Sequence, residues 1–517
     1  MFHPSSKILH STFYILHFTF KPKNYLLNII LCIFIFLTLF SCSSSTKPET
    51  GSLSGKIILV NDTGDPALDP IDYSGITVAL YDLATLDTTI VRINNEYPQI
   101  GVQINQETEF DHRLQNPLRV ITTDSTGNFK FSAINLGRYN LVIFKEGWSI
   151  IYLHEIIISK GDNFLNTASP LIMQNQVELY PAIELEPTVT KDIHFKTNHT
   201  YIITNNTLIL EKSYIEPKSL ILLNPNARLN LAGEISYKQD EGFWRVSSLY
   251  GFYSTQRQNE IEQFDTVSLE YQNSPAIIKN LIMDYANNGL KSGQNALTVN
   301  NCIFRKSLSS TLTITAISAN VEKILLCDTY LKGLIAYNQM TLKNSIFVRN
   351  RESCMLNQSP AIIENNYYYG SYLGIRTYII QAEIKHNCFD KNSVAIAPSA
   401  ASPNISYNNF YDNDRDIEMN RGGVSTDPGY CNPIITYNNF LGNKFYIHLK
   451  GNNSIYGDGY IPFLGVNSDQ IYPYNYLIEQ DLTNHIYDSN YPNSGIVYQV
   501  IMYPRLSSLN ISAGIKR

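Results

Sequence analysis

The feature that most constrains the fold is a six-residue pattern that recurs along the second half of the chain. Each copy starts with an aliphatic residue and ends five positions later with an aromatic residue or Met. The seven copies are IKNLIM (278–283), VNNCIF (299–304), LKNSIF (342–347), IENNYY (363–368), IKHNCF (384–389), ISYNNF (405–410) and ITYNNF (435–440). Their last residues are 21, 43, 21, 21, 21 and 30 positions apart, and the step of 43 is two periods with a degenerate copy near 325–330. A repeat of about 21 residues is typical of a solenoid.

The spacing within each copy requires a bend. Residues five apart in an unbroken strand point to opposite faces, yet both ends of each copy are apolar. The bend falls two positions before the last residue, a slot occupied by Asn366, Asn387, Asn408 and Asn438. Asn adopts left-handed backbone angles more readily than most other residues, and its amide can bond neighbouring backbone. We therefore expect a tight corner at each of these asparagines.

Stacking of such corners predicts a parallel β-helix. Aliphatic and aromatic residues of successive copies then form columns inside it, and the Asn amides lie above one another. We expect eight coils or more between residues 200 and 500, an arrangement in which each coil contacts only its neighbours. The predicted interior includes Ile363, Ile384, Ile405, Phe389 and Phe410.

These repeats resemble the right-handed parallel β-helix proteins of bacterial envelopes, the pectate-lyase-like superfamily, over residues 200–506. Segment 207–235 resembles the opening coils of such proteins, and 486–504 resembles their closing segment. The resemblance leaves the function open, because this fold carries lyases, hydrolases, adhesins and scaffolds alike.

Upstream of the repeats the pattern changes. Segments 51–59, 75–82, 122–148 and 154–159 alternate apolar and polar residues between Gly, Asp and Asn turns, which predicts a small β-sandwich. This region resembles the carboxypeptidase-regulatory-like domain, a transthyretin-like unit that implies a non-catalytic spacer or assembly module. The matching residues are Gly55, Asp124, Gly127, Phe129, Phe131, Leu136, Gly137, Tyr139, Leu141, Lys145, Gly147 and Trp148. An insertion over 88–118 departs from the compact pattern.

The N-terminal segment predicts export and lipidation. Lys21 and Lys23 precede an apolar run over 25–40, and a polar tract follows Cys42. This order is typical of a secretory signal. The sequence Leu-Phe-Ser-Cys ending at Cys42 resembles the bacterial lipobox, which implies that Cys42 bears the lipid of the mature protein. The alternative is a retained membrane anchor with a coincidental Cys.

The predicted organisation is therefore all-β, with a small N-terminal sandwich followed by a right-handed parallel β-helix. The boundaries are a signal peptide over 1–41, a tether over 42–50, a sandwich over 51–185 and a β-helix over 190–517. With a net charge of −6 and no basic cluster, the chain lacks the footprint of nucleic-acid binding. No C-x-x-C pair occurs, so we predict no metal site. We expect Cys302 and Cys388 to be small buried residues of the coils.

Familiar catalytic motifs are absent from the sequence, which holds neither H-E-x-x-H nor G-x-S-x-G nor a phosphate-binding loop. The best candidates are charged residues after Phe410, a cluster most often found in a solvated loop. We consider solvated loop, binding edge and catalytic site as alternatives. The cluster comprises Asp412, Asp414, Arg415, Asp416 and Glu418, with Asp427 in the insertion that follows.

Tyrosines offer a second route to function. Those that do not face the interior would form a stripe able to stack on sugar rings, and filling of the interior is the alternative. The tyrosines of this region are Tyr367, Tyr368, Tyr369, Tyr372, Tyr378, Tyr407, Tyr411, Tyr430 and Tyr437. The predicted ligand-binding residues are Asp412, Asp414, Arg415, Asp416, Tyr372 and Tyr411.

The function expected from the sequence is a lipid-anchored, adhesin-like scaffold of the bacterial outer membrane or cell surface, with glycan as its ligand class. One alternative is a polysaccharide lyase or glycoside hydrolase, and another is a structural component of an envelope complex. The expected partners are the membrane, through the lipid, and polysaccharide or other envelope proteins. No cofactor is expected, although the lyase alternative would call for Ca²⁺.

Overall fold

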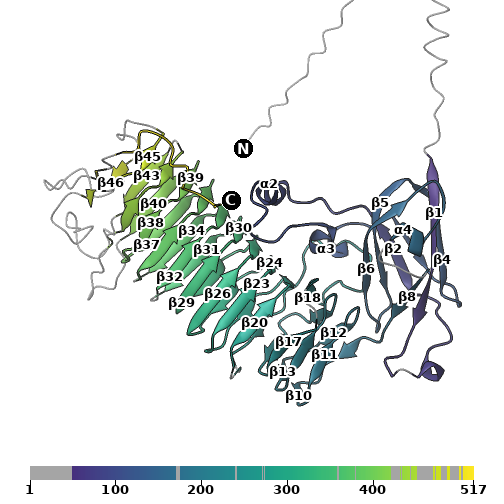
Figure 1. Ribbon diagram of the computed structural model, residues 1–517. Helices are drawn as coiled ribbons and strands as arrows, with labels where there is room; N and C mark the ends of the chain where they lie inside the picture. Colours follow the sequence, from purple (N-terminus) through teal and green to yellow (C-terminus); the bar gives the residue numbers. More distant parts are fainter. Residues whose placement is uncertain are drawn as a thin grey trace, which may run out of the picture. The chain divides into compact units, whose positions relative to one another are not determined.

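The computed structural model describes residues 49–169 except 64, and 175–420 except 239–240, 271, 273, 358–359 and 379. Beyond these it describes 431–450 except 432 and 443, then 470–478 except 472, and finally 486–488, 500–501 and 505–516. Residues Thr50–Arg517 form one compact unit. In Figure 1, a strand-rich region at the right is followed along the chain by a ladder of short parallel strands.

The first region is a sandwich of two sheets. One sheet has the order β3-β2-β5-β6, and in the other β1 pairs with β4, β7 and β8. The strands are β1 (Thr50–Leu59), β2 (Thr77–Tyr81), β3 (Arg119–Thr122), β4 (Asn128–Asn135), β5 (Gly137–Phe144), β6 (Ile151–Ile158), β7 (Gly161–Phe164) and β8 (Gln176–Leu179), with the short helices η1 (Pro66–Leu68) and α4 (Leu165–Ala168). The turn before β4 requires Gly127, whose φ is 85° and whose added Cβ would lie 2.1 Å from the Ile57 carbonyl oxygen.

The second region is a parallel β-helix of about 11 turns. Its first long sheet contains β9 (Ile183–Glu184), β12 (Thr200–Ile203), β15 (Leu220–Leu223), β18 (Trp244–Ser248), β21 (Leu281–Asp284), β24 (Ile303–Arg305), β27 (Leu325–Cys327), β30 (Ile346–Val348), β33 (Tyr367–Tyr369), β36 (Cys388–Asp390), β39 (Asn409–Tyr411), β42 (Asn439–Phe440) and β45 (Tyr476–Leu477).

The second long sheet runs beside it. It contains β10 (Thr188–Val189), β13 (Thr207–Ile209), β16 (Arg228–Leu231), β19 (Thr266–Ser268), β22 (Leu290–Lys291), β25 (Ser310–Ile314), β28 (Lys332–Ala336), β31 (Glu352–Asn357), β34 (Leu373–Tyr378), β37 (Val394–Ser399), β40 (Arg415–Asn420), β43 (Phe445–Lys450) and β46 (Ile486–Asp488).

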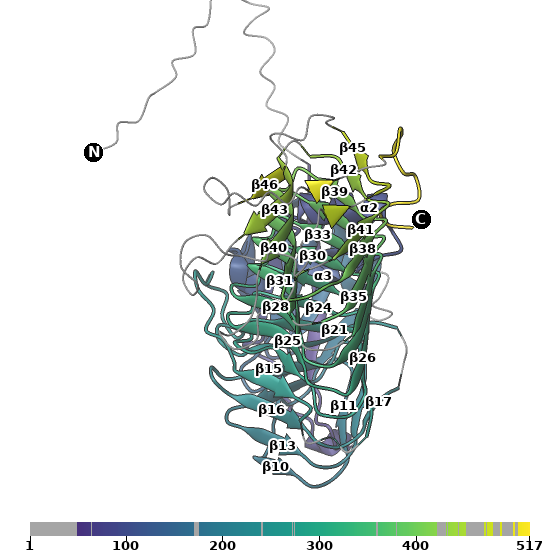
Figure 2. The same cartoon turned by 90° about the vertical axis from the view of Figure 1, so that its left-hand side faces the viewer.

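The remaining strands close the coils. An eight-stranded sheet contains β20 (Ala276–Lys279), β23 (Leu297–Asn300), β26 (Ser318–Glu322), β29 (Gln339–Lys343), β32 (Ala361–Glu364), β35 (Ala382–Lys385), β38 (Asn404–Ser406) and β41 (Ile434–Thr436). Two small sheets contain β11 (Ile193–Phe195), β14 (Ser213–Ile215) and β17 (Ile235–Tyr237), and β44 (Gln470–Ile471) and β47 (Val500–Ile501). The predicted fold class, a small β-sandwich followed by a parallel β-helix, is confirmed (Figure 2).

The predicted interior columns are confirmed. Ile363, Ile384 and Ile405 pair in register on neighbouring strands, and all three are fully buried. The ring of Phe389 stacks between those of Tyr368, at 4.9 Å, and Phe410, at 5.2 Å. The degenerate copy near 325–330 also forms a coil of the stack. Its Leu326 takes the position of the aromatic residue and pairs with Phe304 on one side and Phe347 on the other. Of the cysteines in the described part of the chain, all five are free and buried.

The asparagine column is confirmed, but its backbone geometry differs from the prediction. The left-handed residue of each corner is the one before the Asn, as at Asn365 (φ 64°), His386 (φ 57°) and Tyr407 (φ 56°). The Asn side chain instead points inward, where the Oδ1 of Asn387 accepts from the backbone N–H of Asn366 at 2.9 Å. Backbone amides that the corner leaves unpaired inside the coil need such partners, so Asn is selected for its amide.

A second polar ladder, which the six-residue pattern does not include, lines the next corner of each coil. The Oδ1 of Asn413 accepts from the backbone N–H of Asn392 at 2.8 Å, and the Oδ1 of Asn392 accepts from that of Ser371 at 3.0 Å. The signal was present as an Asn or Ser three positions after the aromatic residue, in FVRN, YYGS, FDKN and FYDN.

The insertion between β2 and β3, residues 82–118, leaves the sandwich and lies on the outer face of the first long sheet. It contains α2 (Thr88–Glu96), α3 (Gln106–Glu109) and η2 (His112–Leu114). Ile90, Ile93 and Ile100 pack in one buried cluster with Ile303 and Ile346 of the sheet. The tail, residues 505–516, reaches the same cluster through Ile515. In Figure 1, α2 and α3 are drawn between the sandwich and the coils.

Candidate functional site

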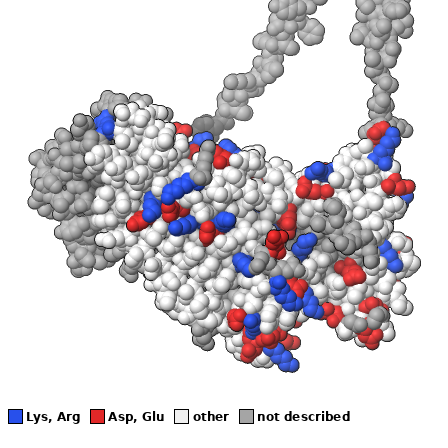
Figure 3. Space-filling view, viewed as in Figure 1, with Lys and Arg blue, Asp and Glu red and all other residues white. Residues whose placement is uncertain are grey.

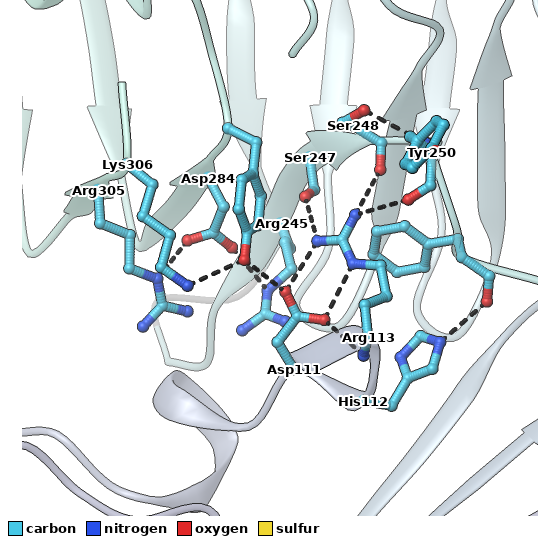
Figure 4. Close-up of polar contacts among 12 residues, drawn as sticks. Asp111, His112, Arg113, Arg245, Ser247, Ser248, Tyr250, Asp284, Arg305 and Lys306 are labelled. Atoms are coloured by element: carbon cyan, nitrogen blue, oxygen red, sulfur yellow. Dashed lines mark hydrogen bonds and ion pairs between the residues drawn. The ribbon is translucent and has the colours of Figure 1, made fainter. Parts of the chain in front are cut away.

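The insertion meets the coils through a network of buried charges (Figure 4). Asp111 binds Arg113 through two hydrogen bonds, both of 2.9 Å, to Nε and Nη2. Arg113 Nη1 also donates to the carbonyl oxygen of Ser248 at 2.8 Å, and Nη2 donates to Ser247 Oγ at 3.1 Å. The sequence forms this link locally, because the Asp111 side chain also caps η2.

The network continues along the first long sheet. Arg305 forms an ion pair with Asp284, and its Nη1 donates to Glu109 Oε1 at 2.9 Å. The Lys306 ammonium donates to the Tyr285 hydroxyl at 2.9 Å, and that hydroxyl donates to Asp111 Oδ2 at 3.2 Å. Cations on the coils thus meet acids on the insertion.

These contacts shift the pKa values of the buried groups. Burial alone would raise the pKa of Asp111, but the charge and hydrogen bonds of Arg113 lower it well below its usual range. Burial lowers the pKa of His112 to about 4, so this ring is neutral at pH 7. Its Nε2 lies 3.0 Å from the Phe252 carbonyl oxygen and its Nδ1 lies 2.9 Å from the Tyr152 hydroxyl. Asp111, Glu109 and Asp284 each pair with an Arg, and the first two link the insertion to the coils through Tyr285 and Arg305.

A cavity of about 660 Å³ opens beside this network, between β6, β8, the start of α3 and the first coils. Small-molecule sites occupy roughly 300–1,000 Å³. Aromatic rings and hydrogen-bonding groups share its wall. The polar and aromatic lining residues are Asn105, Glu107, Tyr152, His154, Glu155, Gln176, Glu178, Tyr180, Asn198, Lys218, Ser219, Phe243 and Arg245. In Figure 3, acidic and basic residues gather around this junction, whereas wide stretches of the coils carry few of them on this face.

β6 places two rings in the cavity wall. Its alternation sends Ile151 and Leu153 into the sandwich core and leaves Tyr152 and His154 on the opposite face. The two rings are parallel to within 6°. Burial, followed by the charges of Arg245 and Lys218, lowers the pKa of His154 to about 3. His154 is therefore a neutral imidazole at pH 7.

The charged residues predicted after Phe410 fall into separate environments. Asp412 is exposed, and Asp414 forms an ion pair with Lys444. Arg415 pairs with Glu418 on β40. Asp416 is buried and accepts a hydrogen bond from Asn413 Nδ2 at 2.9 Å. The run is therefore not one solvated loop, since β40 begins within it.

The tyrosines singled out from the sequence also lie in different environments. Tyr372 is 56% exposed at the turn before β34, whereas Tyr411 packs against the cluster under the insertion. Tyr368 fills the interior, while Tyr407 and Tyr437 stack at 5.1 Å on an outer corner. Tyr372 lies two coils before Asp414 at the same corner, whereas Tyr411 lies under the insertion. Cys42, Asp427 and Tyr430 lie outside the described residues.

No local pattern in the sequence identifies the residues that line the cavity. Lys218, Arg245 and His154 lie on three strands or turns that are distant along the chain, and no local spacing connects them. One signal was available in His154, a His on the polar face of an alternating strand.

No protein-family model matches this chain, and no curated protein or solved structure matches it either. Within the described residues, no helix has the length and apolar character needed to cross a membrane.

Proposed function

We propose that this protein is a lipid-anchored, non-catalytic binding protein of a bacterial cell envelope, and that it holds a glycan in the cavity between the sandwich and the first coils. The resemblance of residues 39–42 to a lipobox supports the anchor. The resemblances to the carboxypeptidase-regulatory-like domain and to the pectate-lyase-like superfamily support an envelope location.

The observation that carries the binding role is the mixed wall of the cavity. Tyr152, Tyr180 and Phe243 offer ring surface, and Gln176 and Asn198 offer amide groups. Sugars present apolar ring faces together with many hydroxyls, so they suit walls that combine aromatic rings with hydrogen-bond donors and acceptors.

The junction is also rigid enough to keep such a wall in place. The ion pair of Glu109 with Arg305 and the hydrogen bonds that Arg113 donates to Ser247 and Ser248 fix the insertion on the coils. A preformed site loses less conformational entropy on binding than a mobile one. We therefore expect binding without a large rearrangement.

A glycan array probed with the whole protein in detergent tests this proposal. The matched variant is Gln176→Trp, which places a large ring in the cavity from β8, where Gln176 is half-buried. We expect this variant to lose the glycans that the unaltered protein retains. The control is Thr298→Trp, because Thr298 is also a half-buried strand residue but lies outside the cavity. This variant should still retain the glycans.

Two results would contradict the proposal. An array without any retained glycan would remove the binding role. Equal retention by both tryptophan variants would place binding elsewhere on the molecule. Breakdown of the retained glycans during incubation would instead favour the lyase or hydrolase alternative.

A further inference from the structure

We propose that Arg245, Lys218 and His154 form a subsite for the acid group of an acidic saccharide, either a carboxylate or a sulfate. This inference rests on the proposed function and specifies its ligand. The three residues come from β18, from the turn before β15 and from β6, and all three line the cavity.

Arg245 keeps hydrogen-bonding capacity for a ligand. Its Nη2 donates to the carbonyl oxygens of Glu107 and Thr108, both at 3.3 Å, and its Nε lies 3.8 Å from Asp284 Oδ2. Within the described part of the chain, its Nη1 has no hydrogen-bond partner. The guanidinium is thus held in place on one side while its other donors stay available, as planar recognition of a carboxylate or sulfate requires.

Lys218 contributes a second cation. Its backbone is left-handed, with φ 60°, and its N–H donates to the Phe243 carbonyl oxygen at 2.6 Å, so the residue is fixed at the turn. The side chain is exposed, and no ion pair with it occurs among the described residues. A cation fixed at its backbone and free at its ammonium can bind an anion with little loss of existing contacts.

His154 lies in the cavity wall, and its buried Nδ1 has no hydrogen-bond partner among the described residues. The charges acting on the imidazole are those of Arg245 and Lys218, both positive. Three carboxylates also line the cavity, but two have partners of their own. Glu178 accepts from the Tyr180 hydroxyl at 2.6 Å, and Glu155 accepts from Arg138 Nη1 at 3.4 Å. The third carboxylate is that of Glu107, which lies in α3.

The test compares three forms of one disaccharide by titration calorimetry with the whole protein in detergent. The first form contains glucuronic acid, the second is the same sugar with its carboxyl reduced to an alcohol, and the third is the reduced sugar carrying a sulfate. We expect both acidic forms to bind at least roughly fivefold more tightly than the neutral form. Tighter binding of the carboxylate form or of the sulfate form shows which of the two acid groups the subsite prefers.

Substitutions locate the subsite. Lys218→Gln should weaken both acidic forms roughly threefold to fivefold and the neutral form by clearly less. The matched control is Lys323→Gln, because Lys323 is also an exposed lysine with a left-handed backbone, φ 52°, outside the cavity. Arg245→Lys keeps the charge and removes the planar fork, so it should weaken the acidic forms as well.

The outcomes separate this inference from the proposed function. Equal affinity for all three forms would keep the glycan-binding role and overturn the acidic subsite. Equal affinities of the Lys218 and Lys323 variants for the acidic forms would also overturn the subsite. Absence of binding by every form, together with a blank array, would overturn both proposals.

Discussion

At the scale of single residues, Asp416 stands out because it places an acid inside the coil. By register it follows Ser353, Gly374 and Ala395 at the same strand position of successive coils. It is 2% exposed, and burial raises its pKa well above the usual range, with only the hydrogen bond from Asn413 opposing. The folded protein therefore keeps this carboxyl protonated at pH values where the unfolded chain has ionised it.

Asp416→Asn should therefore stabilise the protein near pH 7. The amide oxygen can still accept from Asn413, and the cost of protonating or burying the acid disappears, a gain on the order of 1 to 3 kcal/mol. The sign follows from the raised pKa: the unaltered protein loses stability as pH rises above about 4, the unfolded value of Asp. The gain should accordingly grow from pH 4 to pH 7 in urea unfolding. A gain that is constant across this range would contradict the assignment.

At the scale of elements, the insertion determines how the two β regions are joined. Its apolar residues cover an outer sheet face that would otherwise be exposed, Glu109 pairs with Arg305, and Arg113 donates to the Ser248 carbonyl oxygen. The close approach is visible at Gly101, whose added Cβ would lie 2.5 Å from the Ile346 side chain. The tail adds a second contact, since Gln99 Nε2 donates to the Lys516 carbonyl oxygen at 2.7 Å.

Ile93→Ala tests this role of the insertion. Ile93 is fully buried between α2 and the coils, so the truncation should cost about 2 to 4 kcal/mol of local stability. Hydrogen exchange should accelerate in α2 and in residues 99–104 while the interior strands near Phe389 remain protected. Val91→Ala, on the same helix but half-exposed, is the control and should change little. Unchanged exchange in the Ile93 variant would mean that other contacts hold the insertion.

The repeating elements were predictable from the sequence, and the junction was not. Each coil is a local unit, so the spacing of Ile384, Asn387 and Phe389 already specifies strand, corner and column. The identity of the left-handed residue was missed because Tyr407 is unusual at such angles, whereas Asn is common there. The cavity depends on pairs such as His154 and Arg245, which only the tertiary fold brings together.

At the scale of the whole molecule, the sandwich precedes the coils and follows the segment that contains Cys42. β1 starts at Thr50, eight residues after Cys42. If Cys42 carries the lipid, the sandwich lies nearer to the attachment point along the chain than any coil does.

Cys42→Ala tests this arrangement. The substitution removes the thiol that lipidation requires, so the protein should leave the membrane fraction and should no longer incorporate labelled palmitate, because acyl chains hold a lipoprotein through their buried methylenes. Cys302→Ala, a free and buried cysteine of the coils, is the control and should remain in the membrane fraction. The released variant should still retain glycans on the array, because the cavity lies within Thr50–Arg517. Retention of the Cys42 variant in the membrane would mean that the apolar run over 25–40 is itself the anchor.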